Sequence, residues 1–221
     1  MSKPILGYWN IRALAEPIVY LLHYKNVGFE DKRYNLDDRP SWENDKFNLN
    51  LDFPNLPYYI DDNVRLTQST TILRYLAEKY GLDGKTEQEK DQISLVEQQI
   101  VDFRTHLFFM CFEKVVDEIK SQFEEKIPYH AKVIAEFLGN KKYLIGDSLT
   151  YVDFLAYDCI DFCEYLIPNV LDEFPNLKEY QERFENLPEL QSYLKTGTSR
   201  IWPISASKVE FGSKDADQKQ K

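Results

Sequence analysis

Two prolines three positions apart, Pro54 and Pro57, interrupt an apolar stretch in the string Leu-Asp-Phe-Pro-Asn-Leu-Pro-Tyr-Tyr-Ile-Asp at 51–61. Because proline lacks a backbone N–H and fixes its φ angle, neither position belongs inside a helix or a paired strand. We expect an irregular link here, with Pro57 a candidate for a cis peptide bond, followed by a hairpin at 57–67. An irregular backbone leaves N–H and C=O groups free to pair with an extended, peptide-like ligand.

A helical pattern starts directly after this hairpin, at Ser69. Its apolar residues Ile72, Tyr75 and Leu76 recur at the spacing of one helix face. The first N–H groups of a helix have no partner within the helix and carry positive partial charge, so they bind anions. The irregular link, the hairpin and this helix start together predict a site for a small anionic peptide.

The patterns of the first 83 residues alternate between strand and helix. Ahead of the hairpin we expect, in order, a buried strand, a helix, a second strand and a short helix, at 4–8, 14–24, 29–34 and 41–47. The resulting order, β-α-β, link, β-β-α, is typical of a thioredoxin-like α/β domain. We expect this domain to span 1–83.

Beyond a polar linker at 81–87 the strand patterns stop. We expect an all-α domain at 88–221, with helical periodicity at 89–123, after Pro128, and at 151–165, 176–186 and 190–194. Pro128 is expected to mark a helix start, because proline breaks a helix interior. Thr150 and Asp153 have the spacing of a capping box at the start of the helix 151–165.

The charge of the chain excludes one kind of partner. The formal net charge is −10, whereas a nucleic-acid backbone must be met by clustered Lys and Arg, so no nucleic-acid partner is expected. The first 81 residues carry 10 basic and 11 acidic side chains and the rest carry 17 and 26, so an anionic ligand is tolerated better by the first part. No apolar run approaches the roughly 20 residues that span a bilayer, and no signal-peptide pattern starts the chain. We expect no membrane partner and a cytoplasmic location.

The three cysteines, Cys111, Cys159 and Cys163, all lie in the second half of the chain and lack metal-ligand spacing, and no metal is expected. Cys159 and Cys163 are four positions apart in an apolar helical pattern, which favours buried thiols over a redox pair. The first domain has no cysteine, so thiol chemistry of the thioredoxin or glutaredoxin kind is excluded there.

Four strings occur in order along the chain: Leu-Gly-Tyr-Trp at 6–9, Phe-Pro-Asn-Leu-Pro-Tyr-Tyr at 53–59, Leu-Thr-Gln-Ser at 66–69 and Gly-Asp-Ser-Leu-Thr-Tyr-Val-Asp at 146–153. With them the chain resembles the cytosolic glutathione S-transferases of the mu class over nearly its whole length. The resemblance implies the fold of that family, a homodimer, glutathione as co-substrate and transfer of its sulfur to small hydrophobic electrophiles. Two alternatives use the same fold: a non-catalytic carrier of apolar ligands and a glutathione-dependent lipid isomerase.

The resemblance implies that Tyr8, at the end of the first strand, is the catalytic residue. A glutathione thiol has a pKa of ~8.5, and lowering it by about two units needs ~2.7 kcal/mol of preferential interaction with the anion. A hydrogen bond to a charged acceptor contributes roughly 1.5–3 kcal/mol, so one protonated phenol is nearly sufficient. The alternative for Tyr8 is a core tyrosine whose hydroxyl is satisfied by a carbonyl group.

The other glutathione contacts are implied by matching the mu-class pattern position by position. They are Trp9 and Leu14 beside the tripeptide, Trp42 and Lys46 at its glycine carboxylate, Asn55, Leu56 and Pro57 along its cysteinyl backbone, Gln68 and Ser69 at its γ-glutamyl end, Asp102 from the partner subunit, and Arg39. Arg39 lies in the loop 36–41, which is shorter than in vertebrate members. Taken alone, Lys46 and Asp102 are typical of solvated surface charges, and only the resemblance favours ligand contact.

The electrophile is expected in a pocket between the two domains, lined by Trp9, Leu14, Phe108, Cys111, Phe112 and Ile201-Trp202-Pro203. Many mu-class members have a tyrosine in place of Phe112, and its hydroxyl assists epoxide opening and addition to enones. We therefore expect these reactions to be weak here. Phe53 matches the aromatic residue that inserts into the partner subunit, and the alternative is packing within its own chain.

Overall fold

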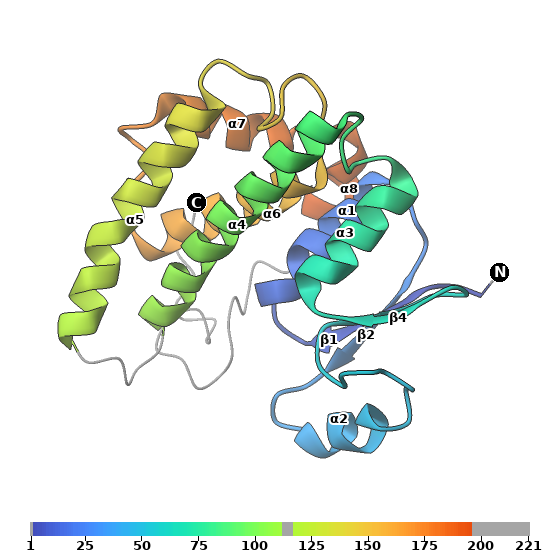
Figure 1. Cartoon of the computed structure of the whole chain (residues 1–221). Helices are drawn as coiled ribbons and strands as arrows, with labels where there is room; N and C mark the ends of the chain where they lie inside the picture. Colours follow the sequence, from blue (N-terminus) through green and yellow to red (C-terminus); the bar gives the residue numbers. More distant parts are fainter. Residues whose placement is uncertain (1, 112–116, 196–221) are drawn as a thin grey trace.

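The computed structural model describes residues 2–111 and 117–195, which form an α/β part followed by a helical part (Figure 1). The elements of the first part are β1 (Ile5–Trp9), the 3-10 turn η1 (Ala13–Ala15), α1 (Glu16–Tyr24), β2 (Glu30–Tyr34), α2 (Arg39–Lys46), β3 (Tyr58–Ile60), β4 (Arg65–Thr67) and α3 (Ser69–Tyr80). The second part consists of α4 (Glu87–Cys111), α5 (Asp117–Leu138), α6 (Tyr151–Leu166), α7 (Pro175–Glu185), the 3-10 turn η2 (Pro188–Leu190) and α8 (Gln191–Lys195).

The four strands form one mixed sheet in the order β2-β1-β3-β4. β1 pairs with β2 in parallel, and the β1–β3 and β3–β4 pairs are antiparallel. Helices α1 and α3 lie on one face of this sheet and α2 lies on the other (Figure 1). This arrangement, followed only by helices in the described part of the chain, confirms the fold class predicted from the sequence.

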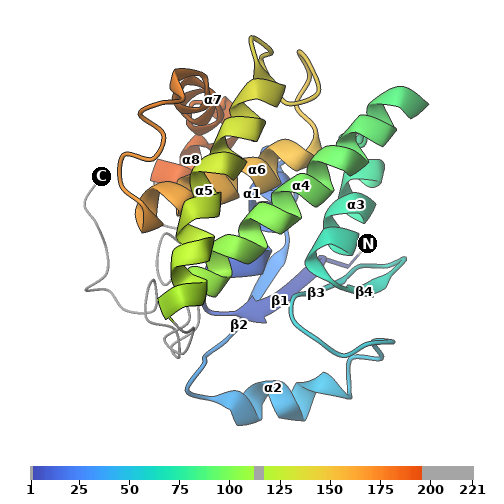
Figure 2. The same ribbon diagram turned by 60° about the vertical axis from the view of Figure 1, so that its left-hand side comes forward.

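Two hydrophobic clusters hold the molecule together. The larger one joins the two parts, because Ile18 of α1 and Leu73 of α3 are buried in the same cluster as Phe103 of α4 and Phe154 of α6. The long helices α4 and α5 lie side by side in both views (Figures 1 and 2). The smaller cluster lies on the α2 side of the sheet and contains Tyr8.

The expectation of a helix start at Pro128 is wrong, because α5 continues through this residue from Asp117 to Leu138. A proline inside a helix costs about 3 kcal/mol. The neighbouring side chains of Ile127, Ala131 and Ile134 are all buried in the larger cluster. Full burial of a single isoleucine contributes roughly 1.5–3 kcal/mol, so the packing of α5 outweighs the cost of its proline.

The predicted capping box at the start of α6 is confirmed. The Thr150 N–H donates to Asp153 Oδ2 over 2.8 Å, and the Thr150 side chain in turn accepts the Asp153 N–H. The buried Asp153 carboxylate also accepts the Leu144 N–H and the Tyr180 hydroxyl, each over 3.0 Å. Asp153 therefore ties the loop before α6 and helix α7 to the start of α6.

Buried ion pairs cross between the two parts of the fold. Arg12, just before η1, donates through Nε to Asp158 over 2.8 Å and through Nη1 to Asp161 over 2.6 Å, both on α6. Arg74 of α3 bonds Glu97 of α4 through Nε over 2.8 Å. Because such pairs are directional, they orient the two parts relative to each other in addition to the apolar packing.

Among the described helices, none is both long and apolar enough to cross a membrane.

Candidate functional site

The hydroxyl of Tyr8 lies where β1 leads into the turn before η1. The Tyr8 side chain is buried, and its Oη accepts the backbone N–H of Leu14 over 3.3 Å. Burial raises the pKa of Tyr8 to about 12, against the Leu14 N–H and the charges of Arg104 and Arg33, which lower it. Tyr8 therefore stays protonated at neutral pH, and its O–H can donate to an anion.

Gly7 explains the close packing of the sheet beside Tyr8. A Cβ atom at Gly7 would lie 2.1 Å from the ring of Tyr58, a distance that no real contact reaches. Tyr58 in turn stacks on Trp42 of α2, with ring centroids 6.2 Å apart. The glycine of the Leu-Gly-Tyr-Trp string thus lets one aromatic layer connect β1 to α2.

The smaller cluster brings together six of the predicted site residues. Three of them are buried members of the cluster: Tyr8, Trp42 and Leu56. The other three are half-buried and pack against it: Trp9, Leu14 and Phe108. They come from β1, the turn after it, α2, the link before β3 and α4. Phe108 also packs against the larger cluster, so the site lies where the two parts of the fold meet.

The link before β3 has the irregular backbone that its prolines predict, and the Leu56–Pro57 peptide bond is cis. Asn55 is exposed, and its Oδ1 accepts the Leu56 N–H over 2.9 Å. Gln68, the residue before α3, has φ 71° and ψ 110°. A non-glycine residue in such a conformation costs of order 1–3 kcal/mol and persists mainly at functional sites. Ser69 is the first residue of α3, as predicted.

The predicted residues of α2 lie at its two ends and on its buried face. Arg39 is exposed at the first position, and Trp42 is buried against Tyr34, with ring centroids 5.4 Å apart. Lys46 is the last residue, and its nearest described acidic partner is Glu43, at 3.7 Å from Nζ. Two cationic side chains are thus available at the ends of this helix.

The sequence also matches the models of a known protein family. The family model of the glutathione S-transferase N-terminal domain matches residues 4–78, and that of the C-terminal domain matches residues 101–197. The chain belongs to the glutathione S-transferase family.

Relatives within this family agree with the mu-class motifs. The transferase is 42% identical over 211 residues to a class-mu 26 kDa isozyme of Fasciola hepatica, with 96% of this chain and 97% of the relative covered. It is 43% identical over 215 residues to glutathione S-transferase Mu 1 of Mus musculus, with coverages of 95% and 99%. A crystal structure of the glutathione S-transferase Blo t 8 superimposes with a TM-score of 0.84 at 32% identity, covering 94% of this chain and 99% of that one. The resemblance identified from the sequence is confirmed.

Several predicted positions of the transferase lie outside the described residues. Phe112, Ile201, Trp202 and Pro203 are among them, and the side chain of Cys111 is not described. Of the predicted electrophile pocket, the structure thus places Trp9, Leu14 and Phe108. Asp102 is exposed on α4, and no described residue of the site is shown against it.

The two remaining cysteines are buried, unlinked thiols, as predicted. Burial raises the pKa of Cys163 to about 12, and it raises the pKa of Cys159 further above its usual range. Neither thiol can supply a thiolate at neutral pH. Among the described residues, no group of three or more His, Cys, Asp or Glu side chains is placed to hold a metal ion.

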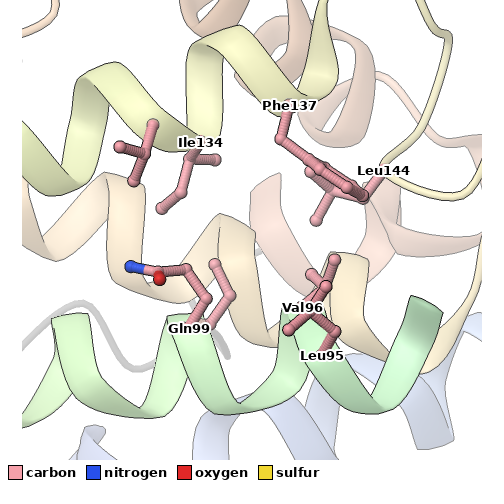
Figure 3. Close-up of a pocket in the computed structure, with 8 residues that line it drawn as sticks. Leu95, Val96, Gln99, Ile134, Phe137 and Leu144 are labelled. Carbon is pink, nitrogen blue, oxygen red and sulfur yellow. The ribbon is translucent and has the colours of Figure 1, made fainter. Parts of the chain in front are cut away.

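An apolar cavity of about 220 Å³ lies between α4 and α5, apart from the Tyr8 site. In Figure 3, Val96 and Gln99 of α4 face Ile134 and Phe137 of α5. Its complete lining is Leu95, Val96, Gln99, Ile100, Val133, Ile134, Phe137 and Leu144. Leu95 is 67% exposed, so the cavity is open to the surface at this residue.

Sequence reasoning missed three arginines near the site. Arg12 is paired with acidic residues of α6, Arg33 lies beside Tyr8 on β2, and the buried Arg104 has an Nη1 without a partner in the described part of the chain. No local pattern identifies them, because Arg12 and its partner Asp158 are 146 positions apart. Only the packed fold places their charges around the Tyr8 turn.

Proposed function

We propose that Tyr8 carries out the defining step of this glutathione transferase, the stabilisation of the bound thiolate that attacks small hydrophobic electrophiles. The observation that carries the proposal is the bond from the Leu14 N–H to the Tyr8 oxygen. It occupies an acceptor position of that oxygen and leaves the O–H proton free to donate to sulfur. Hydrogen bonds in series polarise one another, so the Leu14 N–H also makes the Tyr8 O–H a stronger donor.

The other predicted contacts are proposed to hold the tripeptide along the edge of the first domain. The Leu56 N–H, now bonded to Asn55, exchanges that partner for the cysteinyl carbonyl beside Pro57. Ser69 and Gln68 receive the γ-glutamyl carboxylate at the positive end of α3. Trp42 and Lys46 reach the glycine carboxylate from α2, and Arg39, at the other end of this helix, is a further glutathione contact.

The proposal includes the bounds of the two domains and the location of the protein in the cell. We place the glutathione-binding domain at 1–83 and the helical domain, which contributes the electrophile site, at 88–221. The electrophile pocket is completed by Cys111, Phe112 and Trp202. A cytoplasmic location is proposed on the strength of the mu-class relatives.

The deciding experiment mixes the purified protein with glutathione and a nitro-activated aryl chloride and follows thioether formation by absorbance. We expect saturable turnover in both substrates, with the rate rising with pH as the bound thiol ionises. A carrier would bind the apolar compound without turnover. An isomerase would rearrange an unsaturated lipid while regenerating glutathione, and turnover of that kind alone would contradict the proposal.

We further propose a homodimer in which Phe53 enters the α4–α5 cavity of the second copy. Phe53 is 75% exposed in a short link, and the Thr67 hydroxyl holds its backbone by donating to its carbonyl over 2.9 Å. The cavity of about 220 Å³ is large enough for an aromatic ring, since an apolar cavity of about 150 Å³ binds benzene. In a two-fold dimer each copy would supply one Phe53 and one cavity, and Asp102 would reach the partner's ligand.

Phe53→Ser is expected to dissociate the dimer. Burial of one phenylalanine contributes roughly 1.5–3 kcal/mol, so the two in a symmetric interface account for about 3–6 kcal/mol. This corresponds to a dimer Kd about 10²- to 10⁴-fold higher, measured by light scattering over a dilution series. Glutathione affinity is expected to fall with the dimer fraction, because Asp102 of the partner leaves the site.

Phe47→Ser is the matched control, since Phe47 is 73% exposed in the same domain and has no proposed cavity. On the cavity side, Leu95→Lys places a charge at an exposed lining position and is expected to weaken the dimer without unfolding the chain. A wild-type protein that is monomeric at micromolar concentration would contradict the homodimer. If Phe53→Ser and Phe47→Ser raised the dimer Kd equally, the result would contradict the proposed role of Phe53.

A further inference from the structure

Arg33 connects β2 to the turn that follows Tyr8. In the parallel register of β1 and β2, Arg33 is the partner of Tyr8. Its Nη1 donates to the carbonyl oxygens of Trp9 and Ile11, over 3.0 and 3.3 Å. Its Nε donates to Asp31 over 2.5 Å, and the side chain is only 9% exposed. One guanidinium group thus clasps two backbone carbonyls on one side and a carboxylate on the other.

The clasped carbonyls belong to the turn that determines where the Leu14 N–H points. The turn runs from Trp9 to η1, which starts at Ala13 with an unusual φ of 32°. Directly after it, the Leu14 N–H donates to the Tyr8 hydroxyl oxygen. A shift of the turn would therefore lengthen this bond and change the direction in which the Tyr8 O–H can donate.

The charge of Arg33 also acts on the Tyr8 ring. The guanidinium carbon lies 5.9 Å from the ring centroid, and Nη2 is buried without a partner in the described part of the chain. A positive charge within about 4–6 Å of a titratable group favours its charged form, here the phenolate of Tyr8. The pKa of Tyr8 is lowered by Arg33 in the same sense as by the Leu14 N–H, although burial raises it overall.

We infer that Arg33 is a positioning residue for the glutathione thiolate, which clamps the Trp9–Ile11 turn so that the Leu14 N–H and the Tyr8 hydroxyl form one chain of hydrogen bonds ending at the sulfur. The inference rests on the proposed role of Tyr8. A lysine cannot replace this arginine fully, because one ammonium group lacks the rigid fork that reaches two carbonyls and a carboxylate at once.

The test compares Arg33→Lys and Arg33→Met with the wild type. The readouts are the thiolate absorbance of the glutathione complex as a function of pH, the glutathione Kd and kcat/KM at several pH values. Arg33→Met is expected to raise the pKa of the bound thiol by about half a unit to one unit. Below that pKa the rate then falls roughly 3- to 10-fold, and the deficit disappears at alkaline pH, where both enzymes hold thiolate. For Arg33→Lys, the pKa of the bound thiol and the rate are expected to lie between those of the wild type and those of Arg33→Met.

A matched control is Arg65→Met on β4. Arg65 also donates through Nη1 to a loop carbonyl, that of Leu49, over 3.0 Å, but it is exposed and lies on β4, at the opposite edge of the sheet from β2. Its loss is expected to leave the pKa of the bound thiol unchanged. An Arg33→Met variant with an unchanged thiol pKa, or an Arg33→Lys variant equal to the wild type, would overturn the inference.

A double-mutant cycle separates this inference from the proposed function. If Arg33 acts through Tyr8, Tyr8→Phe combined with Arg33→Met shifts the thiol pKa no further than Tyr8→Phe alone. Additive shifts would contradict the inference. No shift in Tyr8→Phe itself would overturn the role of Tyr8, whereas a shift in Tyr8→Phe without one in Arg33→Met would overturn the role of Arg33 alone.

Discussion

Tyr8→Phe is expected to fold normally and to bind glutathione, yet to lose most of its conjugation rate. The variant removes the one hydroxyl proposed to donate to the sulfur and leaves the ring in its buried place. Loss of that donor is expected to raise the pKa of the bound thiol by about one to two units, at ~1.36 kcal/mol per unit. With a bound-thiol pKa of ~6.5 in the wild type, the thiolate fraction at pH 7, and with it kcat/KM, then falls roughly 3- to 25-fold, measured by thiolate absorbance and by turnover of an aryl chloride.

The matched control for this variant is Tyr58→Phe. Tyr58 is also a buried tyrosine of the smaller cluster, its hydroxyl shares a hydrogen bond of 3.2 Å with that of Tyr34, and it is not among the proposed glutathione contacts. It is expected to keep the wild-type thiol pKa, with at most a small loss of stability. A Tyr8→Phe enzyme that titrates at the wild-type midpoint would remove Tyr8 from its proposed role.

Among the variants proposed for this protein, Arg12→Met is expected to lower the free energy of unfolding most. The variant leaves Asp158 and Asp161 buried without their cation, and breaking a buried pair in this way costs about 3–5 kcal/mol. For a chain of this size that corresponds to a fall in Tm of roughly 6–20 °C, measured by calorimetry. Lys132→Met, which breaks the exposed pair with Glu136, is the control and is expected to change stability by no more than about 1 kcal/mol.

The loss caused by Arg12→Met is also expected to depend on pH. Burial raises the pKa of Asp158, and Arg12 opposes that rise, so the variant raises it further. A carboxyl group whose pKa is higher in the folded than in the unfolded state binds more protons when folded, and stability then increases as the pH falls. The deficit is therefore expected to be larger at pH 8 than at pH 5. Arg12→Met with Asp158→Asn and Asp161→Asn should recover part of it, and a deficit equal at both pH values would contradict the explanation.

Several parts of the site could be predicted from the sequence because neighbouring residues determine them. The prolines before β3 dictate an irregular link, and the start of α3 at Ser69 follows from the apolar spacing behind it. The capping box of Thr150 and Asp153 depends on residues three positions apart. Tyr8 was found because the string that carries it is contiguous, although its assignment as a donor came from the family resemblance.

Other features depend on contacts between distant segments, which leave no local pattern. The periodicity of α5 indicated a break at Pro128, and only the packing of Ile127 and Ile134 on the core shows why the helix continues there. The same holds for Arg12 and its acidic partners on α6, and for the α4–α5 cavity. Arg33 and Tyr8 are 25 positions apart, yet parallel pairing of β1 and β2 makes them neighbours. A residue type and its spacing specify what a side chain can do, whereas the strength of a charge or a hydrogen bond depends on the distance and burial that the complete fold imposes.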